Sequence, residues 1–465
     1  MLGRLLRPID IAPLVFFRTV VCGMITIELL GELLLPSYRA FYTQGEMHFS
    51  YVLLPWLEPW PPAGVWAHML LNIALGVMVT AGFHYRLTAA LAGFSTLLLL
   101  LMEKAAYINH SYLYSLLFLL GSLIPAHGAL SLDVRRGAKQ QQLTAPAWTL
   151  YVLRFQLAVV YIFAGLAKLN GDWLRGVPMT QWQRELPIYS ILGRLVGDET
   201  LGIASSWGGA AFDLLVVPCM LWRRSRSIAF GCAACFHISN ALTFGIGTFP
   251  WVSLAMTALF FPPGSFRRLP ILRSLPKPAL ETALPFRFRT PLLPAALALH
   301  GLTQLILPLR PYLLTTPGWT EFGQRFSWRM MLRAKEGALS YRIVHPGSNR
   351  HDRVDPCESL PPRTCFDMES KPDMIVEFAH FLSRRHQKQF GGARPEVYAD
   401  AYATFNDRPS QRLIDPTVDL ATQERTFEPY PFIVPLGEET LERHEVATRR
   451  SFTPRQAPPS KGLSP

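Results

Sequence analysis

The stretch YIFAGLAKLNGDW (residues 161–173) is an apolar run that ends at a single cation, Lys168. With the apolar residues before it, the run forms a segment over residues 148–169, which is long enough to cross a bilayer as one helix. Two interpretations of Lys168 are open. A lysine at the end of a span can extend its ammonium group into the lipid headgroups. Alternatively, a partly desolvated amine can stay uncharged and act as a base, because burial disfavours the charged form.

The composition of the chain indicates a membrane protein with a water-soluble part. Of its 465 residues, 50% are hydrophobic and only 17% are charged, and the mean hydropathy is +0.19. Such values are unusual for a soluble protein. We expect a transmembrane helical domain over residues 1–310 and an outer soluble domain over residues 311–440. Residues 441–465 contain the Pro- and charge-rich run RRSFTPRQAPPSKGLSP and are predicted to be a disordered tail.

About nine apolar segments have lengths near those that a bilayer requires. They cover residues 13–34, 63–83, 86–103, 111–126, 148–169, 201–221, 227–245, 247–262 and 292–309. The fourth and the eighth are short, so they are either tilted or re-entrant. The predicted fold class is therefore a multi-pass α-helical membrane protein with about eight or nine transmembrane helices, followed by a mainly-β outer domain.

Basic residues are unevenly divided between the two sides of these segments. With a cytoplasmic N-terminus, fifteen lie in inner loops: Arg4, Arg7, Arg86, Arg135, Arg136, Lys139, Arg223, Arg224, Arg226, Arg267, Arg268, Arg273, Lys277, Arg287 and Arg289. Five lie in outer loops: Arg39, Lys104, Arg175, Arg184 and Arg194. Cytoplasmic loops carry the excess of Lys and Arg. The count therefore predicts that Lys168, Asn109, His110 and the soluble domain all lie at the outer face.

The outer domain contains stretches with the alternation of β-strands and one stretch with the spacing of an α-helix. LSYRIVHPG (339–347) resembles a strand that breaks at Pro346 and Gly347, and VYADAYATFNDRP (397–409) alternates as a strand does. MIVEFAHFLSRRHQK (374–388) has apolar residues at helical spacing, with RRHQK as a solvated face.

The six cysteines separate by location. Cys357 and Cys365 lie in the outer domain, where disulfides can form, and we predict that they pair. Two free thiols in a loop are the alternative. The other four, Cys22, Cys219, Cys232 and Cys235, fall in or beside spans and are predicted to be buried small apolar residues.

The sequence gives no support for metal, nucleotide or nucleic-acid binding. No HExxH, paired CxxC, P-loop or GxGxxG motif occurs, so we expect no metal site and no nucleotide site. The net charge of +12 could indicate a nucleic-acid partner. However, the cations lie between apolar segments, so we expect a membrane-lipid partner and no nucleic acid.

Several stretches, taken together, resemble one family. They are RPIDIAPLVFFRTV, YRLTAAL, NHSYLYSLL, PAHGALSLD, YIFAGLAKLNGDWLRGVPM, CFHISNALTFGIGTFPWV, GWTEFGQRFSWRMML and FNDRPSQRLIDPTVDL. In this order they resemble the vitamin K-dependent γ-glutamyl carboxylases and their bacterial HTTM-domain relatives, over residues 5 to 420. The resemblance implies that reduced vitamin K or menaquinone (the hydroquinone) is the cofactor, and that dioxygen and carbon dioxide are co-substrates. In that family the hydroquinone is oxidised to its epoxide while a peptide glutamate becomes γ-carboxyglutamate.

The resemblance also assigns roles within the membrane domain. Lys168 matches the lysine of the family's AGxxKL motif and would be the initiating base. Asn109 and His110 match its NHSYLY motif, and His110 would stabilise an oxyanion on the quinone. A histidine that caps the start of the fourth span is the alternative. Arg184 matches an arginine sixteen residues after the lysine. It would bind a carboxylate, or it is an ordinary interfacial arginine.

Further matches lie in the outer domain. Trp319, Ser327, Trp328, Met330 and Met331 match a WTxxxxxxSWxMM pattern that would line the mouth of the quinone and glutamate pocket. Arg408 and Arg412 match an NDRxxQR motif and would pair either with substrate carboxylates or within a β-turn. Arg333 and Lys335 stand where the animal enzymes have histidine and arginine, so the glutamate pocket differs. Ala167 and Tyr107 also depart from the animal pattern, and the animal enzymes extend further, which leaves propeptide docking open.

The resemblance implies a glutamate-containing peptide or protein substrate. In a bacterium it implies the cytoplasmic (inner) membrane, with the outer domain on the periplasmic, lumenal-equivalent side. The alternative is a quinone-binding or maturation membrane protein that keeps the HTTM fold but has no carboxylase activity.

Overall fold

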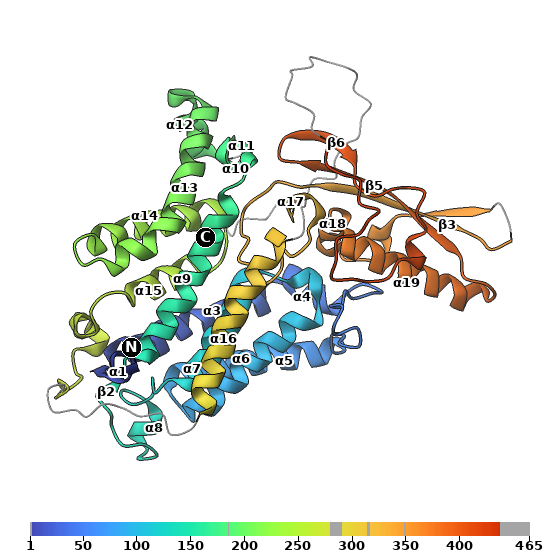
Figure 1. The fold of residues 1–465 in the computed structure, drawn as a ribbon. Helices are drawn as coiled ribbons and strands as arrows, with labels where there is room; N and C mark the ends of the chain where they lie inside the picture. The colour runs from blue at the N-terminus through green and yellow to red at the C-terminus, as the bar shows by residue number, and fades with distance from the viewer. Residues whose placement is uncertain (1, 185, 280–290, 314–316, 348–349, 438–465) are drawn as a thin grey trace.

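The computed structural model describes residues 2–184, 186–279, 291–313, 317–347 and 350–437. The helices of the N-terminal domain form a bundle, and most of them run along its length (Figure 1). The C-terminal domain lies over one end of this bundle. At the opposite end lie α1 (Leu2–Leu6) and α8 (Leu132–Arg135). The tail predicted for residues 441–465 falls outside the described residues.

Seven helices in the described part of the chain are long and apolar enough to span a membrane. They are Ala12–Leu34, α5 (Pro62–Ala81), α6 (Tyr85–Met102), α9 (Trp148–Lys168), α13 (Asp198–Leu221), α14 (Arg226–Phe244) and Leu292–Tyr312, which consists of α16 (Leu292–Leu309) and the start of η5 (Arg310–Leu313). The fourth and eighth predicted segments are helices of 15 and 10 residues, α7 (Asn109–Leu123) and α15 (Phe249–Ala258). The multi-pass helical fold is thus confirmed, with seven full-length spans and two shorter helices.

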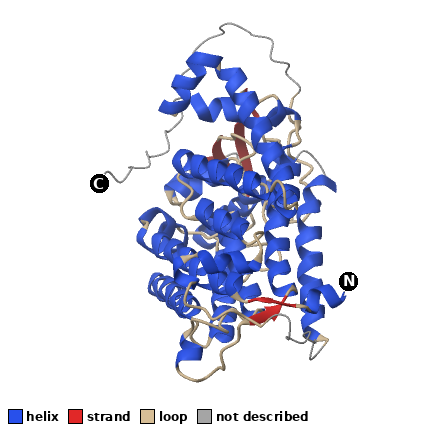
Figure 2. Cartoon of the chain, turned by 90° about the vertical axis from the view of Figure 1, so that its left-hand side faces the viewer, coloured by secondary structure: helices blue, strands red, loops and turns tan. Residues whose placement is uncertain are grey.

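Short elements join these helices. They are α4 (Pro36–Thr43), η2 (Lys104–Ala106), α10 (Gly171–Leu174), α11 (Val177–Arg184), α12 (Pro187–Val196), η3 (Pro263–Arg268) and η4 (Pro270–Leu272). Strands β1 (Pro8–Asp10) and β2 (Thr144–Pro146) pair antiparallel near the N-terminus (Figure 2).

The first long helix accommodates a charge that looks out of place in the sequence. It consists of α2 (Ala12–Phe16), the π-helical turn η1 (Phe17–Val21) and α3 (Cys22–Leu34). Arg18 in this turn is fully buried, and its guanidinium donates to the carbonyl oxygens of Thr80 (2.9 Å) and Ala126 (3.1 Å), among others. A buried cation is tolerated when its donors are satisfied. Arg18 therefore ties α2–α3 to the last turn of α5 and to the loop after α7.

The outer domain contains an antiparallel sheet of order β4-β3-β5-β6. Its strands are β3 (Gly337–Val344), β4 (His351–Val354), β5 (Glu396–Phe405) and β6 (Arg408–Arg412). Its helical elements are α17 (Pro317–Thr320), η6 (Pro356–Glu358), α18 (Pro362–Glu369), α19 (Pro372–Phe390) and η7 (Leu420–Thr422). The sheet-containing domain, the strand at β3 and the amphipathic helix at α19 confirm the predictions.

Two details of the predicted outer domain were wrong. The strand predicted to run to residue 409 ends at Phe405, because Asn406 and Asp407 have left-handed φ values of 50° and 68° and turn the chain into β6. His386, predicted to be on a solvated face, is buried, and its Nε2 lies 2.9 Å from Nδ1 of His345.

The two domains share a hydrophobic cluster and a buried charge network. Leu33 and Phe41 of the bundle lie in the same cluster as Tyr341 and Phe378 of the outer domain. Beside it, Lys104 Nζ lies 2.9 Å from Asp373 Oδ2 and 2.8 Å from Glu377 Oε2 at the start of α19. Arg325 Nη1 pairs with the same Asp373 oxygen at 2.8 Å, and Arg425 Nη1 lies 3.2 Å from Glu377 Oε1. The pairs of Lys104, which lies in η2 directly after α6, connect α19 to the bundle, and those of Arg325 and Arg425 tie α19 to other segments of its own domain.

Candidate functional site

Lys168 is the last residue of α9 and is buried. Its Nζ lies 2.6 Å from Oδ2 of Asp213, in the middle of α13. Asp213 is only 3% exposed, so this ion pair is shielded from solvent by protein. Ionisable groups inside a membrane domain are costly and therefore mark functional sites by default. The pair places a proton donor and a proton acceptor in direct contact.

Gly165 brings α13 to this distance from α9. A Cβ added at Gly165 would lie 2.7 Å from Cγ of Leu214 and 3.1 Å from the backbone nitrogen of the same residue. Real Cβ atoms do not come within 2.7 Å of another carbon, so any larger residue at this position would force the Leu214 side chain and α13 to shift. Because Leu214 follows Asp213, the contact also sets the position of the carboxylate.

The surroundings of Lys168 are apolar and aromatic. Its Nζ lies 5.4 Å from the centroid of the Trp173 ring, within the range of a cation–π contact. Trp173 forms a buried cluster with Ala167, Ala210 and Leu332. The Trp173 indole N–H donates to the carbonyl of Ser206 at 2.8 Å. Within the described residues, the Ser206 hydroxyl is buried and has no hydrogen-bond partner.

Asp172 connects the Lys168 segment to the outer domain. Arg408 donates to both carboxylate oxygens of Asp172, at 2.7 Å and 2.8 Å, and Asn406 Nδ2 donates to Oδ2 at 2.8 Å. Burial would raise the pKa of Asp172, but hydrogen bonds from Arg408, Asn406 and Arg175 outweigh it and lower this pKa to about 2. A bidentate arginine–carboxylate pair fixes geometry as well as charge. The β5–β6 turn therefore clamps the chain four residues after Lys168.

Asn109 and His110 begin α7. The N-cap of this helix is Ile108, without a side-chain cap, so the structure does not show His110 in the capping role. Asn109 Oδ1 accepts from the Tyr107 hydroxyl at 3.1 Å, and its Nδ2 donates to the carbonyl of Arg329 at 3.4 Å. The His110 ring is half-buried and lies against Phe249, with centroids 5.6 Å apart.

Residues 327–332 run between the start of α7, where Asn109 and His110 lie, and the end of α9 beside Lys168. The Trp328 ring stacks on Tyr112 of α7 at 5.1 Å, Arg329 meets Asn109, and Leu332 packs with Ala167 beside Lys168. Met330 is packed against the core of the bundle, whereas Met331 is 41% exposed. Ser327 is buried, and its hydroxyl donates to the carbonyl of Gly323 at 2.6 Å.

The backbone of residues 321–332, which we call the connector, is strained. Glu321, Phe326, Trp328 and Met331 have φ values of 61°, 62°, 56° and 48°. Residues with side chains rarely adopt this left-handed region, and such strain concentrates at binding and catalytic sites. The Trp328 indole nitrogen is also buried without a hydrogen-bond partner in the described part of the chain.

Three other predicted residues lie inside the outer domain. Trp319 is buried against Phe405, and its indole N–H donates to the carbonyl of Val434 at 2.7 Å. Lys335 donates to the carbonyls of Trp319 and Ser370, both at 2.6 Å, and burial lowers its pKa to about 8. Arg333 forms an ion pair with Glu321. In this structure their contacts hold the connector onto the domain.

Arg184 and Arg412 lie at the surface. Arg184 is exposed at the end of α11, with its Nε 3.5 Å from Asp198 Oδ2. Arg412 pairs with Asp400 at 3.0 Å and stacks over Tyr402 on the sheet. Among the described residues, neither arginine contacts Lys168 or its neighbours Asp213 and Trp173.

The predicted disulfide between Cys357 and Cys365 is confirmed, with Cα atoms 5.3 Å apart. Glu369 lies near both sulfur atoms, but they are bonded to each other and are therefore not free to ligate a metal. Of the four other cysteines only Cys22 is buried as predicted: Cys219 is half-buried, and Cys232 and Cys235 of α14 are exposed.

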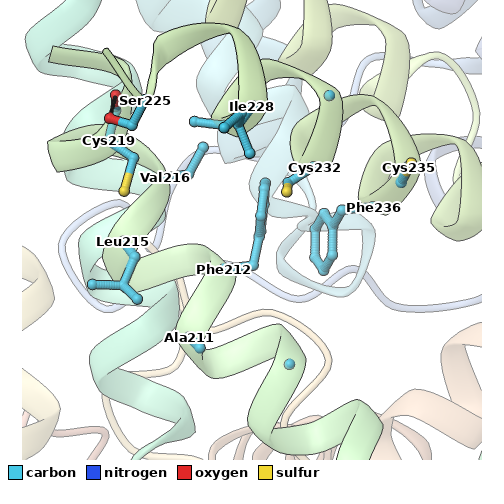
Figure 3. Close-up of a pocket in the computed structure, with 13 residues that line it drawn as sticks. Ala211, Phe212, Leu215, Val216, Cys219, Ser225, Ile228, Cys232, Cys235 and Phe236 are labelled. Carbon is cyan, nitrogen blue, oxygen red and sulfur yellow. Dashed lines mark hydrogen bonds between the residues drawn. The ribbon is translucent and has the colours of Figure 1, made fainter. Parts of the chain in front are cut away.

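A cavity of about 720 Å³ lies between α13 and α14 (Figure 3). Its walls are small and apolar residues, including Phe212, Phe236, Cys232 and Cys235. Its lining contains no acidic or basic residue. The cavity therefore suits a hydrocarbon chain, whereas the acid–base groups lie on the α9 side of α13.

Sequence reasoning missed the partners that organise this site. Asp213 is the only charged residue in the predicted span 201–221, and this isolation was a usable signal. Asp172 lies inside the stretch quoted first, but its partner Arg408 is 236 residues away. Glu321 stands two residues after Trp319, and the sequence contains no signal that it pairs with Arg333.

The fold and the site define the class of this protein, a multi-span membrane protein with a sheet-containing domain over one end of its bundle. Residues 6–264 match the model of the HTTM domain. Residues 289–439 match the model described as the lumenal domain of vitamin K-dependent gamma-carboxylase. The chain therefore belongs to the vitamin K-dependent γ-carboxylase family, as its motifs predicted. No solved structure matches it significantly.

Proposed function

We propose that this protein is an integral-membrane γ-glutamyl carboxylase that depends on reduced vitamin K or menaquinone. It would couple oxidation of the hydroquinone to its epoxide, by dioxygen, with carboxylation of a peptide glutamate. The observation that carries the proposal is the buried pair of Lys168 and Asp213, 2.6 Å apart, at the end of α9 nearest the outer domain. A family member that had lost its chemistry would have no need of this costly pair.

The residues around this pair fit a hydroquinone. Binding sites for such molecules have apolar and aromatic walls with a few polar atoms that fix orientation. Trp173 and Leu332 supply apolar walls near Lys168, and the buried Ser206 hydroxyl is a polar atom without a partner among the described residues. When bound and oxidised, the cofactor supplies the strong base that removal of a glutamate γ-proton requires.

Lys168 and Asp213 would together initiate the reaction. A proton shared across the 2.6 Å hydrogen bond between Nζ and Oδ2 would be able to move to Asp213 without changing the net charge of the pair. The neutral amine of Lys168 would then be able to accept a proton from a hydroxyl of the bound hydroquinone. Asp213 is thus the temporary acceptor that makes Lys168 available as a base.

The connector and α7 would position the reacting groups. His110 would stabilise the oxyanion of the deprotonated quinol, an electrostatic role. The connector meets α7 at Asn109 and α9 at Ala167, so it would cover the site and exclude water. We place the N-terminus in the cytoplasm and the outer domain on the opposite side, since the excess of basic loop residues favours that orientation.

The test measures two products in one incubation. Purified protein in lipid would receive reduced vitamin K or menaquinone, labelled bicarbonate and glutamate-containing peptides. We expect epoxide and labelled peptide from the wild-type protein, and a loss of at least about 100-fold in both for Lys168→Ala. Lys388→Ala, an exposed lysine of α19, is the matched control and should be unaffected.

Three outcomes are informative. Undiminished epoxide formation by Lys168→Ala would remove the proposed base. Epoxide without labelled peptide would restrict the activity to quinol epoxidation. Absence of both products from the wild-type protein would favour a quinone-binding or maturation protein.

A further inference from the structure

A second pocket, which we call the interdomain pocket, lies where the outer domain meets the bundle. It has a volume of about 300 Å³. Leu101, in the last turn of α6, and Leu307, in α16, contribute to one side, and Asp373 of α19 contributes to the other. Leu101 and Leu307 lie close to the ends of their spans, so the pocket is at the level where lipid headgroups lie.

Three buried polar atoms in the lining residues of this pocket lack a hydrogen bond. They are the hydroxyl of Tyr51, Nε of Arg310 and Oδ1 of Asp373, and none has a partner among the described residues. A buried polar atom without a partner costs about 1–3 kcal/mol, so native structures rarely keep one without a reason. Three around one pocket indicate a polar ligand that supplies the missing bonds.

The charges of the pocket determine the kind of ligand. Lys104, Arg310 and Arg325 face Glu321, Asp373 and Glu428, so neither sign is in excess. Within the described part of the chain, Arg310 has no carboxylate within 4.0 Å, whereas Lys104 and Arg325 both pair with Asp373 Oδ2. What remains is one guanidinium donor, that of Arg310, and two acceptors, Oδ1 of Asp373 and the carboxylate of Glu428, which has no ion pair among the described residues. A zwitterion matches a free donor beside free acceptors better than an anion or a cation does.

The guanidinium of Arg310 and the carboxylate of Asp373 are connected through Arg325. Arg310 Nη2 donates to the carbonyl of Arg325 at 2.8 Å, and Arg325 Nη1 donates to Asp373 Oδ2 at 2.8 Å. The pocket is also lined by Leu53, which is 74% exposed, and Phe427, which is 49% exposed. Apolar side chains next to a zwitterion site suit a membrane amphiphile better than a soluble peptide.

We propose that the interdomain pocket binds the headgroup of phosphatidylethanolamine. The phosphate accepts hydrogen bonds from Arg310 Nε and the Tyr51 hydroxyl, and the primary ammonium donates to Asp373 Oδ1. A choline headgroup has no N–H to donate, and a glycerol headgroup has no cation. The three protein atoms are closed off from solvent, so the headgroup enters by parting the side chains that cover them.

The experiment measures which lipid the full-length protein retains. Protein exchanged into mixed micelles with equimolar phosphatidylethanolamine, phosphatidylcholine and phosphatidylglycerol is analysed by native mass spectrometry. We expect one phosphatidylethanolamine per chain. Tyr51→Phe and Arg310→Lys should each lower its retention at least about tenfold, the value of one hydrogen bond to a charged group. Arg310→Lys keeps the charge, and Tyr51→Phe removes only an unbonded hydroxyl, so both variants should fold.

Tyr85→Phe is the matched control. Its hydroxyl is also buried and unpartnered in the described residues, but it lies at the first residue of α6, whereas the pocket is at the other end of that helix. Equal retention of phosphatidylcholine, or unchanged retention in both pocket variants, would overturn the proposal. Preference for phosphatidylglycerol would indicate an anion site instead, and displacement of lipid by a soluble glutamate peptide would indicate a peptide site. Because the readout is lipid retention, it is independent of the carboxylase activity.

Discussion

Lys168 Nζ and Asp213 Oδ2 lie 2.6 Å apart in a part of the bundle that solvent hardly reaches, although 45 residues separate them in the chain. The first prediction concerns this pair. Asp213→Asn leaves a buried ammonium without its counter-ion, which typically costs 3–5 kcal/mol of stability. It should also lower epoxide formation at least about 100-fold, because the proton acceptor for Lys168 is gone.

A loss of folding would also abolish activity, so a double variant is needed as the control. Lys168→Met with Asp213→Leu removes both charges together and should recover most of the thermal stability that Asp213→Asn loses. It should remain inactive. An active double variant would contradict a role of this pair in catalysis.

Gly165→Ala tests whether close helix contact sets the site. The added methyl group would lie 2.7 Å from Leu214 and would push α13 away from α9. We expect a loss of about 1–3 kcal/mol in thermal unfolding, together with reduced epoxide formation. Gly208→Ala is the control on the other face of α13, where an added Cβ has no atom within 4 Å. Equal activity of the two variants would rule out this contact as a determinant.

The clamp between Asp172 and Arg408 should make stability depend on acid pH. The folded-state pKa of Asp172, about 2, lies below its unfolded value near 4. Its contribution is therefore present above about pH 4 and is lost as the pH falls toward 2. After allowance for solvent screening we expect about 1 kcal/mol, and Arg408→Ala should remove it. Thermal unfolding between pH 5 and pH 2 measures this, with Arg412→Ala as the surface control.

Lys335 should make stability depend on alkaline pH, again rising as the pH rises. Burial lowers its pKa to about 8, below the unfolded value near 10.5. Between these values the unfolded state binds more protons, so the stability of the folded state rises with pH across that window. We expect about 2 kcal/mol between pH 8 and pH 10.5 in chemical unfolding of the outer domain. The increase should be absent from Lys335→Met and kept by Lys388→Met.

The disulfide of the outer domain closes a loop with a sequence separation of 8 residues. A loop of that size should contribute about 2.5 kcal/mol in the chain-entropy estimate. We expect Cys357→Ala with Cys365→Ala to lower the thermal midpoint of the outer domain. The exposed Cys232 and Cys235 serve as the control pair, and their replacement by alanine should have little effect. An unchanged midpoint in the first variant would show that the bridge is dispensable.

Much of the fold was predictable because its signals are local. An apolar run long enough for a bilayer identifies a span wherever it occurs, so the seven full-length helices were visible, and α7 and α15 were correctly expected to be short. The alternation in β3 and the helical spacing in α19 are likewise local properties. The end of β5 was not predictable in this way, because it depends on the left-handed turn at Asn406 and Asp407.

The candidate site was only half predictable. Lys168, Asn109 and His110 were found from motifs and from loop charges. Trp319 belongs to the same family motif as Trp328, and Arg333 and Lys335 follow that motif. All three lie inside the outer domain, and no spacing rule distinguishes them from the residues that face α7.

The sequence by itself determined that the chain crosses a membrane several times, that a soluble domain follows, and that Lys168 stands where an apolar span ends. These results depend on hydrophobicity and periodicity, which act over neighbouring residues. Only the tertiary structure decided which charges meet. Asp213 reaches Lys168 because Gly165 allows two helices to touch, and Arg408 reaches Asp172 because the outer domain folds over the end of the bundle. Such pairs depend on packing between distant segments.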